Sequence, residues 1–220
     1  MNSAAVVTQI KPLSKDPNFR RVYVNKRAVA LLRASDVEKL HLREGMTWNA
    51  HVAAAVQSEH EALKARQAAM RMLGRRAYSR GELMERLVRR GHSQLAASRT
   101  VDELAADHWI DDARYAQEIV SAASSRKPAS QRLLKSKLTA RKIDPDTASE
   151  ILSKETRDSD DAKALTFARQ QLRTMKDLRR PVAASRIASK LARRGFEQQT
   201  IIETLEQIGL SESPGDQEQD

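Results

Sequence analysis

The chain contains no cysteine among its 220 residues. Disulfide frameworks, thiolate metal sites and cysteine nucleophiles are therefore excluded. Aromatic residues make up only 4% of the chain, and there are just seven glycines and six prolines. Large β-sheets favour aromatic and β-branched residues, whereas helices favour Ala, Leu, Arg, Lys, Glu and Gln, which dominate from about residue 49 onward. The composition therefore predicts a mainly helical protein.

Long hydrophobic runs are also missing. No stretch approaches the roughly 20 apolar residues that a membrane-spanning helix needs. The first seven residues lack both the charged segment and the sustained apolar segment of a secretory signal. We therefore expect a cytoplasmic protein that does not engage a membrane.

Patterns that carry catalysis are absent from the sequence. The five histidines are scattered and never form a His-Glu-x-x-His motif, and there is no phosphate-binding glycine loop. The pairs Asp111-Asp112 and Asp160-Asp161 could be metal ligands, but each precedes a predicted helix, where an acidic residue caps the amides and favours the helix dipole. We therefore expect a protein that is not an enzyme and that needs no cofactor or metal.

The charge is strongly positive, with a net charge of +10 and a pI near 10.1. The excess of basic residues lies mostly in residues 61–208, whereas the last twelve residues hold four acids and no base. A basic body favours a polyanion, or a partner already coated with one, over the alternative that the charge serves solubility alone.

The first 48 residues form a separate unit in this interpretation. Two apolar runs within 21–32 flank Asn25-Lys26-Arg27, which predicts a β-hairpin. Ser35 and Glu38 have the spacing of a capping box, which predicts a short helix through Leu42. We therefore expect a small α+β module over residues 1–48.

The rest of the chain repeats itself. The segments 83–92, 134–143 and 187–196 share two apolar residues four apart, then Arg, a helix-ending residue and a less polar residue. Ser79 with Glu82, and Asp144 followed by Pro145, mark further helix starts. Periods of about 50 residues are typical of stacked arrays in which each unit buries its apolar face on the next. We therefore expect three tandem three-helix repeats in a curved, solenoid-like array: a linking helix and first repeat over 49–110, a second repeat over 111–158 and a third over 159–209, followed by a disordered acidic tail over 210–220.

The basic residues of the repeats fall into two groups. Arg90, Arg141 and Arg194 lie near the apolar stripe in the last turn of their helices, which favours a structural role. A second group lies on the polar flank of the repeated helices or in two arginine-rich loops near Arg75 and before the third repeat's second helix. Rows of like charge slightly destabilise a helix, which indicates an anionic counterpart. The candidate binding residues are Arg76, Arg80, Arg86, Arg89, Lys137, Arg179, Arg180, Arg186, Lys190 and Arg193.

Three motifs resemble the RecX family: the start Ser79-Arg80-Gly81-Glu82-Leu83, the helix end Arg90-Gly91, and the step 109–116, Trp-Ile-Asp-Asp-Ala-Arg-Tyr-Ala. The similarity extends from about residue 61 to 209. It implies tandem three-helix repeats that bind in the groove of the filament formed by the RecA recombinase on DNA. It also implies suppression of strand exchange, ATP hydrolysis and repressor autocleavage.

The sequence departs from the family pattern at two helix-ending turns. Lys142 stands where the other repeats have Gly91 and Gly195, so we expect the second repeat's helix to end without a left-handed residue. The turn at 124–129 lacks the glycine that members of the family often carry there.

Two functional hypotheses follow. The first is a monomeric, non-enzymatic modulator, mainly a negative regulator, of RecA, with weak direct contacts to the single- or double-stranded DNA of the filament. The alternative is an autonomous basic helical DNA-binding protein, because capped helix pairs with basic faces are also typical of that class.

Overall fold

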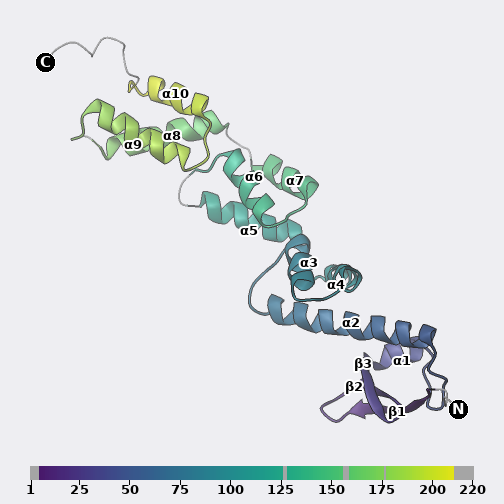
Figure 1. The fold of residues 1–220 in the computed structure, drawn as a ribbon. Helices are drawn as coiled ribbons and strands as arrows, with labels where there is room; N and C mark the ends of the chain where they lie inside the picture. Colours follow the sequence, from purple (N-terminus) through teal and green to yellow (C-terminus); the bar gives the residue numbers. More distant parts are fainter. Residues whose placement is uncertain (1–4, 126–127, 156–158, 176, 211–220) are drawn as a thin grey trace. The chain divides into compact units, whose positions relative to one another are not determined.

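The computed structural model describes residues 5–125, 128–155, 159–175 and 177–210 (Figure 1). The chain divides into two compact units, Met1–Ile110 and Asp111–Asp220. The described residues are mainly helical, with one small antiparallel sheet near the N-terminus, which confirms the predicted fold class. Within these residues, no helix is both long and apolar enough to cross a membrane.

The sheet has three strands in the order β1-β2-β3: β1 (Val7–Leu13), β2 (Asp16–Val24) and β3 (Arg27–Arg33). The predicted hairpin is confirmed as β2 and β3, with Asn25 and Lys26 at φ 46° and 67° in its two-residue turn. Strand β1 was not predicted from the sequence. Its apolar alternation is interrupted by Pro12 and by irregular pairing between Val7 and Gln9, which hides the period of two.

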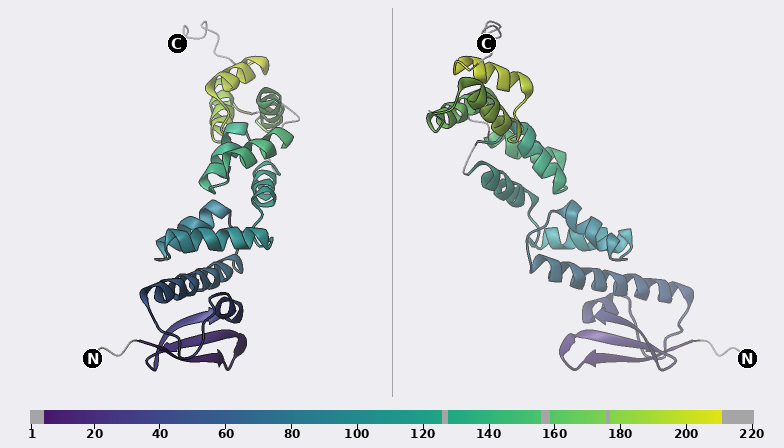
Figure 2. Two further views of the ribbon diagram at one scale, coloured as in Figure 1. Left: turned by 90° about the vertical axis from the view of Figure 1, so that its right-hand side faces the viewer. Right: turned by 60° about the vertical axis from the view of Figure 1, so that its left-hand side comes forward.

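One face of the sheet packs into a small core. Val22, Val24 and Leu32 are buried there with residues from α1 (Ala34–Lys39) and α2 (Ala50–Leu73). Figure 2 shows the backbone of the sheet with the helices beside it. The predicted capping box is wrong: α1 begins one residue before Ser35, and Asp36 accepts the Arg33 amide at 3.2 Å. Strand β3 runs directly into this helix, which places Asp36 rather than Glu38 at the third helical position.

The first unit is completed by α3 (Arg80–Arg89) and α4 (Gln94–Ala106). The long α2 packs against β3 and also against α3 and α4, so one helix both links the module to the repeat and belongs to the repeat. Ala69, Leu83, Leu87 and Leu104 are fully buried at the centre of this three-helix group.

The second unit contains two further three-helix groups. The first consists of α5 (Asp112–Ser124), α6 (Gln131–Ala140) and α7 (Pro145–Glu155), packed around Leu134 and Leu138. The second consists of α8 (Asp160–Arg173), α9 (Arg180–Ala192) and α10 (Gln198–Gln207), packed around Phe167 and Leu191. Leu210, which the sequence reading placed in the tail, is buried in this last core. The remaining predicted tail, 211–220, lies outside the described residues, as do Arg126 and Lys127 of the turn that lacks a glycine.

The three repeated helices end in the same way. A residue with positive φ follows each helix: Gly91 at 87°, Lys142 at 56° and Gly195 at 81°. The next amide then bonds back five residues, as in Ile143 N to Leu138 O at 3.1 Å. The expectation for Lys142 was therefore wrong, because these hydrogen bonds hold a lysine in the left-handed region.

Two predicted helix starts are confirmed, and the start of α8 needs a correction, as that of α1 did. Ser79 accepts the Glu82 amide, and Asp111 accepts the Arg114 amide at 2.9 Å, as predicted. Helix α8 is instead capped by Ser159, which precedes the Asp160-Asp161 pair. The two aspartates occupy its first turn, where they still favour the helix dipole.

Candidate functional site

The basic residues of the first repeat are largely engaged inside the protein. The buried carboxylate of Glu82 lies 2.6 Å from Arg76 and 3.2 Å from Arg86. The guanidinium of Arg76 also lies 3.7 Å from the centre of the Tyr78 ring. These contacts hold the loop before α3 against the helix, so Arg76 and Arg86 have a structural role.

The other two candidates on α3 are paired as well. Arg80 contacts Asp102 of α4 at 2.5 Å, and Arg89 contacts Glu85 one turn earlier at 3.4 Å. Both pairs are exposed, so each contributes at most about 1 kcal/mol of stability. They nevertheless neutralise this face of the first repeat.

Helix α9 of the third repeat differs at the matching positions. Arg186 stands where the first repeat has Glu82, and Ser189 stands where it has Glu85. Arg193 donates only to its own helix, to the Ser189 carbonyl at 3.2 Å, and Lys190 donates to the Gln171 side chain at 2.5 Å. Within the described part of the chain, Arg186, Lys190 and Arg193 form no ion pair. Because neither of these two positions carries an acid, the three cations of α9 have no ion-pair partner on their own helix.

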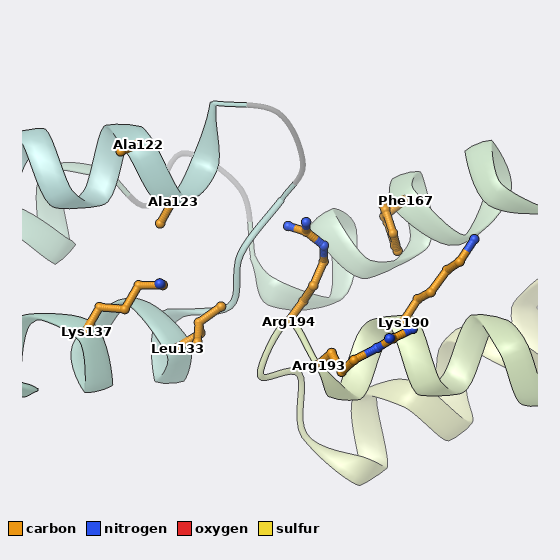
Figure 3. A pocket seen from close by; sticks show the side chains of 8 residues that line it. All are labelled: Ala122, Ala123, Leu133, Lys137, Phe167, Lys190, Arg193 and Arg194. Atoms are coloured by element: carbon orange, nitrogen blue, oxygen red, sulfur yellow. The ribbon is translucent and has the colours of Figure 1, made fainter.

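This row lies beside a hollow between the second and third repeats. The hollow has a volume of about 500 Å³ and is lined by four cations, Lys137, Lys190, Arg193 and Arg194, together with the less polar Ala122, Ala123, Leu133 and Phe167. Figure 3 shows Lys137 reaching from α6 into the space below α5, while the other three cations come from α9 and its end. The structure thus brings together three of the predicted candidates, one from the second repeat and two from the third.

Arg194 joins the hollow although the sequence assigned it a structural role. Its guanidinium donates to the Pro128 carbonyl at 2.8 Å and lies 5.5 Å from the centre of the Phe167 ring. Burial lowers the pKa of Arg194 from its ordinary value, but an arginine remains charged at neutral pH. Arg194 therefore both holds the junction and adds a fixed positive charge.

The two walls of the hollow are joined through the backbone. The Ser130 amide donates to the Arg194 carbonyl at 3.1 Å, and Arg132 donates to the Gly195 carbonyl at 3.1 Å. Asp160 accepts the Gln131 amide at the start of α6. These long-range bonds fix the spacing between Lys137 on one wall and Lys190 and Arg193 on the other.

A second, smaller hollow lies further along α9. It has a volume of about 330 Å³ and places Arg186 and Lys190 beside Met175, Asp177 and Leu178. Lys190 borders both hollows, which makes the two depressions neighbours along one helix.

The arginines at the start of α9 are not among the residues that line either hollow. Arg179 and Arg180 were predicted to lie in a loop, but α9 begins at Arg180, and Arg179 is the residue before it. Arg180 donates to the Gly209 carbonyl just after α10, which is a structural contact. Of these two candidates, Arg179 alone has no side-chain hydrogen bond to a described residue.

Among the described residues, no group of three His, Asp or Glu side chains is placed to hold a metal ion. His60 contacts the Leu31 backbone at 3.0 Å. Burial, followed by the nearby cations Lys64, Arg71 and Arg90, lowers the pKa of His92. What the geometry supports is attraction of an anion to α6 and α9.

Solved structures share this fold. A crystal structure of a regulatory protein RecX superposes with a TM-score of 0.70 over 92% of this chain and 99% of that one, at 15% identity. The RecX structure from Lactobacillus salivarius gives a TM-score of 0.53 over 69% of this chain and 98% of that one, at 19% identity.

Sequence comparisons agree with the fold. Residues 65–104 match the family model described as RecX, first three-helix domain. Regulatory protein RecX of Chlorobium phaeobacteroides is 34% identical over 146 residues, which are 66% of this chain and 93% of that protein. Regulatory protein RecX of Chromobacterium violaceum is 36% identical over 151 residues, or 67% of this chain and 91% of that protein. With motifs, fold and nearly the whole length of these relatives in agreement, the chain belongs to the RecX family of regulatory proteins.

Proposed function

We propose that this chain is a modulator, mainly a negative regulator, of the RecA recombinase. It acts as a cytoplasmic monomer that binds in the groove of the RecA–DNA filament, where it suppresses ATP hydrolysis, strand exchange and repressor cleavage. Its membership of a family of regulatory proteins supports this role.

The observation that carries the proposal is the uncompensated cationic surface of the second unit. Lys137, Lys190 and Arg193 border one hollow, and none of them has an acidic partner among the described side chains. Cations at i,i+4 and i,i+3 on one helix repel each other by a few tenths of a kcal/mol per pair. A carboxylate or phosphate of a binding partner would offset this repulsion. Arginine can donate two hydrogen bonds to either group.

The filament groove supplies anions of this kind, since it presents both protein side chains and DNA phosphates. The surface has no aromatic side chain exposed for base readout, because Phe167 is buried. We therefore expect binding that does not depend on DNA sequence.

The test is the ATPase activity of RecA on single-stranded DNA, titrated with this protein at fixed salt. We expect a dose-dependent fall. We expect the variant Lys190→Ala/Arg193→Ala to need roughly thirtyfold more protein, since two lost charge-assisted contacts of about 1 kcal/mol each amount to about 2 kcal/mol. A flat response to the unaltered protein would refute the proposed function.

The matched control is Arg114→Ala/Lys154→Ala. It removes the same two charges from the same unit, but these side chains are exposed and paired within their own helices, to Glu118 and Glu150. If the control loses as much activity as the α9 variant, net charge rather than the hollow is responsible. Tight binding of duplex DNA without RecA, with a steep salt dependence, would favour the autonomous DNA-binding alternative.

A further inference from the structure

The N-terminal sheet has one covered face and one face that the core leaves free. α1 packs against β2 and β3, and α2 packs against β3. Val22, Val24, Ala30 and Leu32 enter the core on the covered side. Side chains alternate along a strand, so the residues between them point to the opposite face. In Figures 1 and 2 both helices lie on one side of the sheet.

The free face combines aromatic and basic side chains. Along β2 it carries Phe19, Arg21 and Tyr23 in alternation, and Arg21 pairs across the sheet with Lys11 on β1 and Leu31 on β3. The Lys11 ammonium lies 5.9 Å from the centre of the Tyr23 ring, which places both residues on this face. The two aromatic rings and Leu31 are half-buried and lie outside the module's core cluster.

Negative charge is absent from this face among the described residues. The four acids of the module lie elsewhere: Asp16 accepts the Asn18 amide, Asp36 caps α1 and Glu44 accepts the Ile10 amide at the edge of β1. Glu38 belongs to α1, which packs on the covered side of the sheet. Arg33 forms an ion pair with Glu103 of α4 at 3.9 Å, so its charge is compensated. The exposed Lys26, in the turn of the hairpin three residues after Tyr23, adds further positive charge.

We propose that this open face binds single-stranded DNA. Aromatic rings on an exposed sheet give unpaired bases a surface to stack on, while neighbouring cations attract the phosphates. Duplex DNA does not suit such a surface, because its bases are already stacked and paired. Single-stranded RNA offers similar bases and phosphates, and the experiment below compares it with DNA directly.

This inference does not depend on the proposed regulation of RecA. It concerns a different unit from the hollow beside α9, and it predicts binding in the absence of any partner protein. Phe19, Arg21 and Tyr23 were not among the residues that the sequence singled out, because the signal appears only when β1, β2 and β3 are paired.

The experiment is fluorescence anisotropy of a labelled oligo-dT with the full chain and no RecA. The comparison is made in the Lys190→Ala/Arg193→Ala background, so that the basic hollow contributes little. We expect Tyr23→Ala to weaken binding about tenfold, because stacking on one ring contributes on that scale. Tyr23→Phe keeps the ring and should retain the affinity. Arg21→Glu alters an exposed side chain, so it should keep the fold while weakening binding and reducing the salt dependence.

The control is Trp109→Ala, which removes an aromatic side chain that is 56% exposed elsewhere in the same unit. It should bind as the parent does, and circular dichroism should show native helix content for every variant compared. The proposal is overturned if folded Tyr23→Ala and Arg21→Glu both bind like the parent. It is also overturned if oligo-U or a duplex binds more tightly than oligo-dT.

Discussion

Helices α3 and α9 hold equivalent places in the first and third repeats, yet their cations meet different surroundings. On α3, Arg86 and Arg89 are paired with Glu82 and Glu85. On α9, the residues at the positions of those two acids are Arg186 and Ser189. The same row of basic residues is therefore neutralised in one repeat and open in the other.

This difference shows that the number of basic residues does not identify a binding surface. The first unit uses its cations internally, as Arg76, Arg80 and Arg99 each contact an acid. The second unit leaves cations facing a hollow. Substitutions at equivalent positions of the first and third repeats should therefore have different effects on the two units.

The largest difference in stability should come from the two glycines that end α3 and α9. An alanine at either position has an unfavourable left-handed backbone, which costs about 1–2 kcal/mol. At Gly91 a Cβ would meet nothing within 4 Å, whereas at Gly195 it would lie 2.7 Å from both the Leu133 Cβ and the Ser130 Oγ. Gly195→Ala should therefore lose a further 1–3 kcal/mol, roughly, by overpacking the junction between the second and third repeats.

Urea unfolding with hydrogen-exchange readout on α3 in the first unit and on α6 and α9 in the second would measure that difference. Gly91→Ala serves as the control, because it shares the backbone strain without the clash. Equal losses in the two variants would show that the junction has room for the extra methyl group.

A charge swap tests the comparison directly. Arg186→Glu places an acid at the position of Glu82, four residues before Lys190, where it can pair along the helix. We expect the variant to require about tenfold more protein to suppress RecA ATPase, because an internal partner now competes for the cation. Arg169→Glu on α8 provides the same charge change away from the α9 row, and equal effects would argue for net charge alone.

The acid sensitivity of the first unit should exceed that of the second, because Glu59 is buried. The pKa of Glu150 in the second unit is also lowered, but at an exposed ion pair that solvent screens. Burial by itself would raise the pKa of Glu59, but hydrogen bonds from Arg99 and Lys39 outweigh it and hold the pKa below the ordinary 4.5. A depressed pKa stabilises the folded state above the unfolded value, and this stabilisation is lost as pH falls through the folded value. The unfolding free energy of the first unit should therefore drop below about pH 4.5, and it should drop less steeply in Glu59→Gln.

Tryptophan fluorescence isolates this effect, since Trp48 and Trp109 both belong to the first unit. Urea titrations at neutral pH and near pH 3 would give the two free energies. An identical pH slope in the unaltered protein and in Glu59→Gln would assign the acid sensitivity to other carboxylates.

The smallest expected effect concerns the second repeat. Lys142 has φ of 56° where the other repeats have glycine. Lys142→Gly removes left-handed strain but makes the unfolded chain more flexible, so the net gain in stability should be at most about 1 kcal/mol. Thermal unfolding should show a slightly raised midpoint, and a lowered one would mean that the lysine side chain contributes more than its backbone strain costs.

Much of the helical part could be predicted because its signals are local. Capping side chains such as Ser79 and Asp111 act within three residues, and apolar residues four apart define a buried helical face wherever they occur. Strand β1 was missed because Pro12 and irregular pairing disturb its alternation, and its identity depends on β2 beside it.

The candidate site was predicted less completely. The sequence selected Lys137, Lys190 and Arg193, which the structure brings to one hollow, but it assigned Arg194 to structure alone. It also could not separate these residues from Arg76 and Arg86, whose partner Glu82 depends on how the loop before α3 folds back. A helical wheel shows which residues share a face, but it does not show what lies opposite that face.

The sequence by itself determined the helical repeats, most of their starts and ends, and the positive charge, because these depend on neighbours within a few residues. Only the tertiary structure decided which cations are neutralised and which remain open, and which aromatic residues share the free face of the sheet. Ion pairs such as Arg80–Asp102 and cross-strand neighbours such as Lys11 and Arg21 join residues distant in sequence. Coulomb interactions and side-chain contacts fall off with distance in space, and folding alone sets that distance.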